Sequence, residues 1–361
     1  MERKFSKDCT LAIKGIAIIL LLWHHLFWKN YTMVQSFSIG EVNLLAFSAQ
    51  ASNLCVSLFF LLSAYGLTVT YKKWNAQKKS DFSFIADRYI SLLAGFVLIC
   101  VFGYVSGAFL DRNLIDIYGG TAKSFFLVPI DMLGLARLFD VETFNPTWWY
   151  MSLAAILIFV FPVAYKYIKK YGIAAVLSLS FLLLIPQGAG MVQYFAVASV
   201  GIYLANINGF VRLADMKLLK TKWLNKIIKF ALISFSFAVL IILRMSVLED
   251  FDQAVDGLIA VLISWFALEF LLLIKPLKII LVFLGKHSAN VFMTHTLFYS
   301  YYFKDFYYSF KNPFLVFAVL LLTSLLFSVA LEFLKQMCRY NKLIFVIREK
   351  IQLRFNRVPG T

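Results

Sequence analysis

Long apolar segments constrain this chain more than any other feature. Ten runs are long enough to cross about 30 Å of hydrocarbon at a helical rise of about 1.5 Å per residue. They lie at residues 11–28, 43–70, 84–108, 147–168, 171–187, 190–206, 226–247, 254–274, 279–302 and 313–337. The chain is 61% hydrophobic, whereas soluble domains are roughly 45–50% apolar, so an ordinary soluble globule is excluded. The sequence predicts an all-α fold, a polytopic bundle of about ten transmembrane helices.

The lysines and arginines indicate the topology, because cytoplasmic loops of membrane proteins are enriched in them. With the N-terminus inside, 27 of the 35 basic residues fall in cytoplasmic segments, 7 in outer loops and Lys14 in the first span. Both ends are therefore predicted to be cytoplasmic. The net charge of +16 follows from this topology, so nucleic acid is not an expected partner. We expect a multi-pass protein of the cell (inner) membrane that contacts its lipids.

The two ends of the chain support a simple domain division. The first apolar run follows Arg3, Lys4 and Lys7, as in a signal peptide, but no small-residue cleavage site follows the run, so we expect it to be retained. An integral membrane domain is expected over residues 1–338, and a basic cytoplasmic tail, attracted to an anionic leaflet, over 339–361. The four cysteines lack metal-ligand spacing, and neither a metal site nor a disulfide framework is expected.

The first span carries two ionisable residues, which are costly in a membrane and mark candidate sites. Lys14 and His25 are eleven residues apart, and about 1,100° of helical turn returns them to within about 20° of one face. Their axial separation is about 16 Å, a distance that a thin acyl-carrying arm could bridge. Alternatively, Lys14 extends to the headgroups and His25 lies at the interface beside Trp28. His24 points about 100° away and is a secondary candidate.

Three further segments have both a functional and a purely structural interpretation. Ser63, at the end of the second span, either permits close helix packing or contributes to a site. Arg88 opens the third span at the cytoplasmic surface, where it either anchors the helix or meets a phosphate. Trp148, Trp149 and Tyr150 begin the fourth span, as an interfacial aromatic belt or as a platform for stacking a sugar.

The ninth span is unusually polar for a helix that contacts lipid. It begins with Leu284-Gly285-Lys286-His287-Ser288. Ser288 and His295 are its candidate site residues, and hydrogen bonding within the core is the alternative for His295. Two intramembrane acids, Glu269 and Glu332, could each pair with Lys14 or with a histidine.

Several of these elements occur in an order that resembles a known family. They are Lys14-Gly15-Ile16-Ala17-Ile18 leading to His25, Phe59-Phe60-Leu61-Leu62-Ser63, Trp148-Trp149-Tyr150, and Leu284-Gly285-Lys286-His287-Ser288 followed by His295. Together they resemble the acyltransferase type 3 family of integral membrane acyltransferases over roughly residues 8–335. The most specific element is a basic residue, ten intervening positions and a histidine, which falls on Lys14 and His25.

The resemblance implies a reaction and roles for these residues. An acyl group, usually acetyl from acetyl-CoA, would be transferred to a hydroxyl of a capsular, exopolysaccharide or other envelope glycan, free or lipid-linked. Acetyl-CoA would be a co-substrate, with no cofactor held by the protein. His25 would be catalytic together with Lys14, because an imidazole with a pKa near neutrality can remove a hydroxyl proton or accept the acyl group. The donor would be bound by Lys14, Arg88 and Ser63. The acceptor or supporting residues would be Trp148, Trp149, Tyr150, His295 and Ser288.

The chain departs from the family at the expected donor site. Arginine is more common where Lys14 stands, and lysine cannot form the same bidentate phosphate contact. The family's basic cluster before the third span is reduced to Asp87-Arg88, with Ser91 and Ala94 where arginine and proline are common. The predicted donor site is therefore less complete than in the family.

Two other classes of function remain as alternatives. A lipid-linked glycan flippase or polymerase would bind pyrophosphate with intramembrane cations and use no acyl-CoA, but the several intramembrane arginines that it needs are not evident in the sequence. A non-enzymatic scaffold or sensor would have no use for costly intramembrane histidines such as His25 and His295. Loss of acyl transfer on substitution of His25 would separate the first hypothesis from both alternatives.

Overall fold

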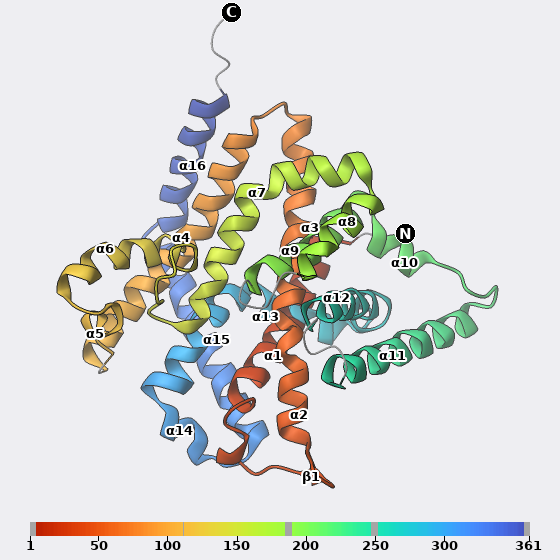
Figure 1. Cartoon of the computed structure of the whole chain (residues 1–361), viewed down its shortest axis with the longest axis horizontal. Coiled ribbons are helices and arrows are strands. Elements are labelled where there is room, and N and C mark those ends of the chain that lie inside the picture. The colour runs from red at the N-terminus through yellow and green to blue at the C-terminus, as the bar shows by residue number, and fades with distance from the viewer. Residues whose placement is uncertain (1–4, 111, 185–189, 247–251, 357–361) are drawn as a thin grey trace, which may run out of the picture. The chain divides into compact units, whose positions relative to one another are not determined.

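The computed structural model describes residues 5–110, 112–184, 190–246 and 252–356 (Figure 1). These residues form helices almost throughout, with one antiparallel hairpin made by β1 (Ser38–Ile39) and β2 (Val42–Asn43). Among them, eight helical segments are long and apolar enough to cross a membrane, or nine if the bent pair Met191–Asn206 and Gly209–Asp215 is one span. The eight are Lys7–Phe27, Leu44–Ala76, Asp81–Phe109, Pro146–Tyr171, Lys222–Ser246, Asp252–Leu273, Lys275–Tyr302 and Pro313–Met337. The chain is therefore an all-α, polytopic helix bundle, as predicted.

One expected span, at residues 171–187, is not among these segments. The helix α7 (Trp149–Tyr171) ends where Gly172 adopts φ 58°, a positive angle that glycine tolerates. The short α8 (Ile173–Ser180) and the 3-10 turn η5 (Phe181–Leu184) follow, and the rest of the range lies outside the described residues. Eight helical residues cover only about 12 Å. α8 packs against α9 (Gly190–Asn206) instead of continuing α7.

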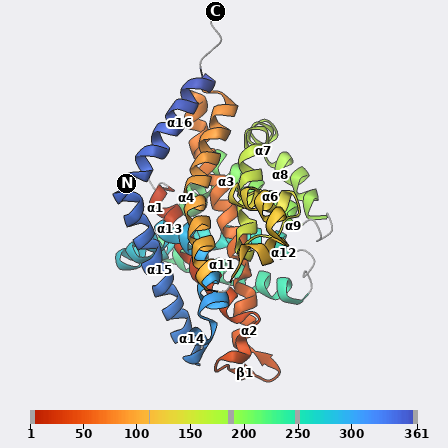
Figure 2. The same ribbon diagram turned by 90° about the vertical axis from the view of Figure 1, so that its left-hand side faces the viewer.

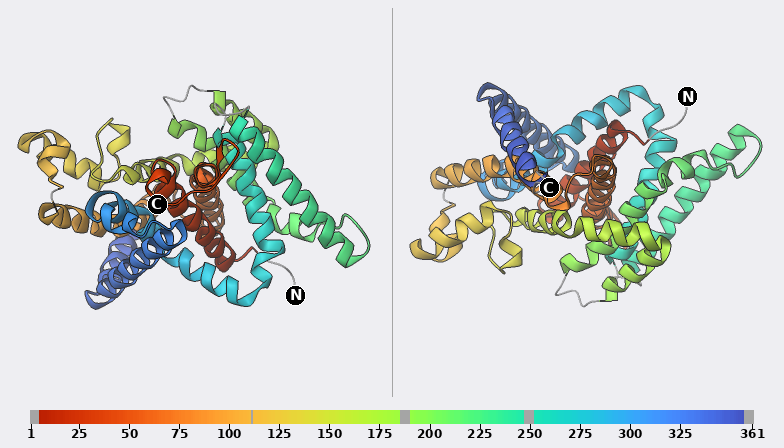
Figure 3. Two further views of the ribbon diagram at one scale, coloured as in Figure 1. Left: turned by 90° about the horizontal axis from the view of Figure 1, so that it is seen from below. Right: turned by 90° about the horizontal axis from the view of Figure 1, so that it is seen from above.

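The chain divides into two compact units, of which the first comprises residues 1–28, 38–70 and 163–288. Its further helices are α1 (Lys7–Phe27), α2 (Leu44–Ala51), most of α3 (Cys55–Ala76), α10 (Gly209–Asp215), α11 (Lys222–Ser246), α12 (Asp252–Glu269) and the first part of α13 (Lys275–Thr296). α12 contacts α1, α9, α10 and α11, and is thus central to this unit. Figure 1 and both views of Figure 3 show α11 running beside it, in teal.

The apolar sequence of the first unit explains this packing. A buried cluster joins the turn just before α3 to α11 and α12. Its members are Leu54, Ile241, Val255 and Ile259. Ser6 immediately precedes α1, and its hydroxyl accepts a hydrogen bond from the Cys9 N–H and so caps the helix. The capped end fixes where α1 starts, and therefore where its later polar residues lie.

The second unit comprises residues 29–37, 71–162 and 289–361. Its elements include α4 (Asp81–Phe109), α5 (Leu114–Tyr118), α6 (Thr121–Met132), η3 (Ala136–Leu138), η4 (Pro146–Trp148), the π-helical η9 (Leu297–Tyr302), α14 (Lys304–Ser309), α15 (Pro313–Met337) and α16 (Tyr340–Asn356). α16, which covers most of the expected tail, packs along α4 and also contacts α15 (Figure 2). Residues 340–356 of the expected tail therefore form a helix that belongs to this unit.

Candidate functional site

The two neighbouring histidines of α1 have different surroundings. His24 is buried, and its Nδ1 lies 2.8 Å from the carbonyl oxygen of Ala49 in α2. The His24 ring also stacks on Trp28, with 5.3 Å between centroids. His25 is half-buried in the last turn of α1. His24 is thus held in place by packing, whereas His25 is partly accessible.

Lys14 lies on the same face of α1 as His25, and its side chain is also half-buried. Among the residues that the structure describes, the Lys14 ammonium forms no hydrogen bond or ion pair. The sequence left two acids open as its partner. Glu269 lies with one carboxylate oxygen 3.6 Å from the Nζ of Lys229 on α11, and Glu332 forms an ion pair with Lys335 of α15 at 2.7 Å. An ammonium without a counter-charge in an apolar span is costly unless a ligand or solvent compensates it.

A close crossing of α1 and α13 lies next to Lys14. A Cβ atom on Gly15 would overlap the carbonyl oxygen of Leu281, and one on Gly285 would overlap that of Leu11. The glycines in the two family-like segments therefore allow the backbones to touch. Ser288, one turn along α13, is buried and donates a hydrogen bond of 2.9 Å to the Gly285 carbonyl oxygen. That contact stays within α13.

The segment around Ser63 has a comparable packing role. A Cβ on Gly201 of α9 would lie 2.5 Å from the carbonyl oxygen of Leu61 and 3.1 Å from the Cβ of Ala64. Ala64 and Gly201 thus let α3 and α9 approach closely. Ser63 itself is half-buried and, within the described part of the chain, forms no hydrogen bond. Its hydroxyl is not used in this packing.

A buried ion pair in the first unit was missed in the sequence. Arg244 and Asp256 lie at the facing ends of the expected spans 226–247 and 254–274, and both are buried, near the end of α11 and the start of α12. Their side chains form a two-pronged contact, in which Nη2 and Oδ2 are 3.2 Å apart and Nε also donates to Oδ1. Arg244 also donates to the carbonyl oxygen of Gln50, at 3.4 Å. Their positions at span ends gave no sign of burial.

In the second unit, the aromatic residues around the start of α7 make different packing contacts. Trp148 is buried, and its indole N–H donates to the carbonyl oxygen of Met293 at 2.9 Å. The amide of Asn145 donates to the same oxygen, also at 2.9 Å. Tyr150 packs on Phe292, with ring centroids 4.8 Å apart. Trp148 and Tyr150 thus attach α7 to the end of α13, and their rings are engaged in that packing.

His295 is fully buried among the aromatic residues of α13 and η9. Its Nδ1 lies 3.0 Å and 2.9 Å from the carbonyl oxygens of Val291 and Phe292 on its own helix. The ring also stacks with Tyr299, at a centroid distance of 6.1 Å. These contacts agree with the alternative of core hydrogen bonding.

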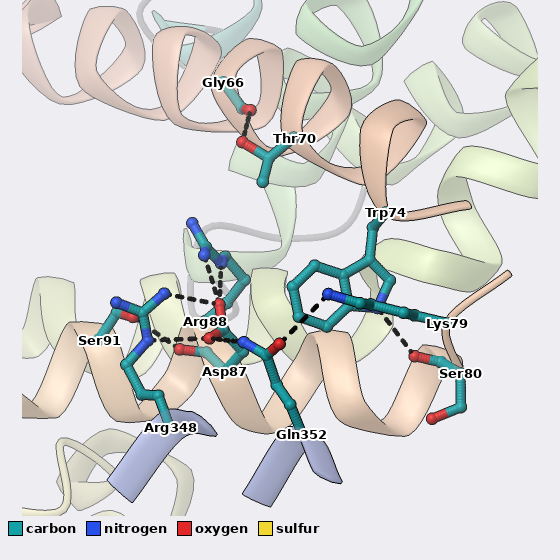
Figure 4. Close-up of polar contacts among 10 residues, drawn as sticks. All are labelled: Gly66, Thr70, Trp74, Lys79, Ser80, Asp87, Arg88, Ser91, Arg348 and Gln352. Atoms are coloured by element: carbon teal, nitrogen blue, oxygen red, sulfur yellow. Dashed lines mark hydrogen bonds and ion pairs between the residues drawn. The ribbon is translucent and has the colours of Figure 1, made fainter. Parts of the chain in front are cut away.

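Arg88 belongs to a charged cluster that the sequence showed only in part (Figure 4). Its guanidinium donates to the fully buried carboxylate of its neighbour Asp87. Arg348 of α16 donates to both oxygens of that carboxylate, at 2.8 and 3.0 Å, and Gln352 donates at 2.8 Å. Two arginines surround one carboxylate, so the cluster keeps a net positive charge. Arg348, 261 residues away in sequence, could not be found from spacing.

Lys79 adds a further cation to this cluster. Its ammonium donates to the side-chain oxygen of Gln352 at 3.3 Å and lies 4.6 Å from the centre of the Trp74 ring. The cluster lies at the start of α4, which topology places at the cytoplasmic face. Guanidinium and ammonium groups gathered at one helix end are suited to binding phosphate.

Comparison with known proteins agrees with the sequence elements described above. A family model described as an acyltransferase domain matches residues 12–333. The match includes the α1 segment with Lys14 and His25 and the start of α13. No curated protein and no solved structure gives a significant match. Because the family model covers most of the chain, this membrane protein belongs to the acyltransferase type 3 family.

Proposed function

We propose that this membrane acyltransferase transfers acetyl from acetyl-CoA to a hydroxyl of a capsular, exopolysaccharide or other envelope glycan at the cell (inner) membrane. The observation that carries the proposal is the pairing of His25 and Lys14 on one partly accessible face of α1. One residue can move a proton, and the other is a cation without a counter-charge among the described residues. An anionic acyl donor would compensate that charge.

The chemistry assigned to His25 is proton transfer during attack on the thioester. The imidazole takes the proton of the acceptor hydroxyl as its oxygen forms a bond to the acyl carbon. The carbon–sulfur bond then breaks, and the leaving thiolate takes the proton back from the imidazolium. An alternative sequence forms an acyl-imidazole first and then transfers the acyl group to the hydroxyl. Both sequences yield an O-acetyl ester and free CoA.

Phosphate groups of the donor have two candidate partners, one in each unit. Lys14 is the candidate on α1. In the second unit, the candidate is the cluster of Arg88, Arg348 and Lys79 around Asp87, because it keeps excess positive charge at the start of α4. Arg348 of α16 thus adds a second arginine beside Asp87-Arg88, where the third span lacks the family's basic cluster. Ser63, with its unused hydroxyl, remains a proposed donor contact.

The decisive test is acetylation by the full chain in lipid nanodiscs, followed with radiolabelled acetyl-CoA and by NMR of O-acetyl groups on envelope glycans. We expect His25→Ala to reduce transfer by about a hundredfold or more, because loss of a general base typically costs 10²–10⁴-fold. His287→Ala is the matched control, since His287 is a half-buried histidine of another membrane helix. Equal glycan spectra for wild type and His25→Ala would overturn the proposal. A change in glycan length without acetylation would favour a flippase or polymerase.

A further inference from the structure

A cavity of about 430 Å³ in the second unit has no assigned role. Its volume lies within the roughly 300–1,000 Å³ of small-molecule sites. It is lined by polar and aromatic groups that include Arg112, Arg137, Glu142, Thr143, Trp149 and Tyr301. Arg112 follows α4, and Tyr301 lies near the end of η9. The other four residues lie before α7 or, for Trp149, at its first position. The predicted topology places all three of these helix ends on the outer side of the membrane.

Arg112 is held at the cavity by several contacts. Its Nε donates to the carbonyl oxygen of Phe144 at 3.0 Å, and Nη2 donates to the same oxygen. The guanidinium also lies 3.5 Å from the centre of the Tyr301 ring, a cation–π contact. Within the described residues, Nη1 has no hydrogen-bond partner. The Arg112 guanidinium is therefore oriented by its contacts and still has an N–H group available, and none of these contacts is with an anion that would neutralise its charge.

The wall behind Arg112 is buried and hydrogen-bonded. Phe144 is buried, and its N–H donates at 2.9 Å to the buried carboxylate of Asp131, which also accepts from the Tyr118 hydroxyl at 2.6 Å. The Phe144 ring packs where a Cβ on Gly107 would lie. An arginine supported in this way loses little conformational entropy when it binds an anion.

Arg137 supplies a second cation to the cavity. It lies in the short η3 turn, and its backbone N–H is held by the hydroxyl of Ser152 at 3.2 Å. Its side chain is exposed and, among the described residues, forms no ion pair. Glu142 is also exposed at the cavity and forms no ion pair with either arginine. Two arginines and one glutamate leave the cavity with a net positive charge.

From this arrangement we infer that the cavity binds an anionic sugar unit of the acceptor, one that carries a carboxylate or phosphate group. Arginine guanidinium groups recognise the flat carboxylate and the phosphate by paired hydrogen bonds. The Trp149 ring, half-buried at the cavity wall, offers the apolar surface on which a sugar ring stacks. This inference rests on the proposed glycan acceptor, and it names the acceptor's charge class.

The test measures binding to the full chain in nanodiscs of neutral phosphatidylcholine, so that it does not depend on turnover. The probes are a glucuronate-containing tetrasaccharide, a phosphorylated maltotetraose and unmodified maltotetraose. We expect Arg137→Gln to weaken binding of both anionic probes at least tenfold and to leave the weak binding of the neutral probe unchanged. Lys123→Gln is the matched control, because Lys123 is an exposed cation of the same outer region that does not line the cavity.

Three outcomes would overturn the inference. These are equal binding of neutral and anionic probes, unchanged anionic binding in Arg137→Gln, or loss of sugar binding when anionic phosphatidylglycerol is added at constant ionic strength. The last result would identify the cavity as a lipid-headgroup site. The His25→Ala chain must bind the anionic probes like wild type, since His25 does not line the cavity. If Arg137→Gln loses binding while no chain acetylates glycans, the proposed reaction fails and the sugar site stands. If Arg137→Gln acetylates glycans and binds the anionic probes normally, only the inference of a sugar site is contradicted, and the proposed reaction stands.

Discussion

Gly285 of α13 lies directly against the backbone of Leu11 in α1, so closely that a Cβ on residue 285 would overlap the Leu11 carbonyl oxygen. The reciprocal contact, Gly15 against Leu281, lies on the other side of the same crossing. Backbone atoms leave no flexible side chain that can move aside. This crossing holds α1, and with it Lys14, against α13.

Substitution of the crossing glycine is expected to destabilise the first unit. Gly285→Ala should lower the free energy of unfolding by about 1–3 kcal/mol, the usual cost of overpacking. Gly66→Ala is the control, because no atom lies within 4 Å of a Cβ at that helical position, and alanine is the better helix former by about 1 kcal/mol. Thermal unfolding in detergent would measure both. Equal stability of the two variants would contradict the close crossing.

The buried pair of Arg244 and Asp256 should also be needed for stability. Arg244→Ala is expected to cost about 3–5 kcal/mol, because it leaves the Asp256 carboxylate buried without its partner. Arg212→Ala, at an exposed arginine of α10, should change stability little. Denaturant unfolding in mixed micelles compares the two, and similar midpoints would show that the pair does not stabilise the unit.

The Asp87 cluster should control how firmly α16 is attached. Asp87→Ala leaves Arg88 and Arg348 facing each other without their shared anion, so it should loosen α16 more than Arg348→Ala does. Hydrogen–deuterium exchange over residues 340–356 would report the loosening. Arg354→Ala, at an exposed residue of α16, serves as the control. Unchanged exchange in Asp87→Ala would exclude the cluster as the attachment.

Asp131 is expected to make stability depend on pH. Burial raises its pKa from 3.8 to about 6, although hydrogen bonds from Tyr118 and the Phe144 N–H oppose the shift. Because the folded-state pKa lies above the unfolded one, the protonated form is favoured in the fold. Stability is therefore lost as pH rises from about 4 to about 6, by roughly 3 kcal/mol at 1.4 kcal/mol per pKa unit.

Asp131→Asn should remove this component of the pH dependence. The difference in melting temperature between variant and wild type should grow in favour of the variant from pH 4 to pH 6 and then level off, since Asp131 is ionised above that range. Thermal unfolding of both chains in the same detergent across pH 4 to 7.5 would measure the difference. A constant offset would mean that Asp131 titrates normally.

Lys14 should act on the acyl donor through its charge. Lys14→Met is expected to lower kcat/KM for acetyl-CoA by about tenfold, which corresponds to about 1.4 kcal/mol, and Lys14→Arg should recover most of the loss. The acceptor KM, measured at saturating donor, should not change. A Lys14→Met chain with normal donor kinetics would show that the lysine only anchors α1.

The sequence alone determined the class of fold and the face of α1 on which the candidate residues lie. Both follow from local properties, since run length sets whether a helix can cross a membrane and the helical repeat places Lys14 and His25 on one face. The order of elements such as Lys14-Gly15 and Gly285-Lys286 was enough to indicate the family, which the domain match then confirmed.

Only the tertiary structure decided the partners of the polar residues. The helical repeat gives a face but not the helix that packs on it, so spacing could not choose Lys229 for Glu269 or Arg348 for Asp87. The break at Gly172 likewise depends on a backbone angle that an apolar run conceals. The sequence also could not show that Trp148 and Arg112 donate hydrogen bonds to the carbonyl oxygens of Met293 and Phe144, because those acceptors come from other segments of the chain. Such contacts arise from packing between distant segments, where hydrogen-bond geometry and desolvation act over only a few ångströms.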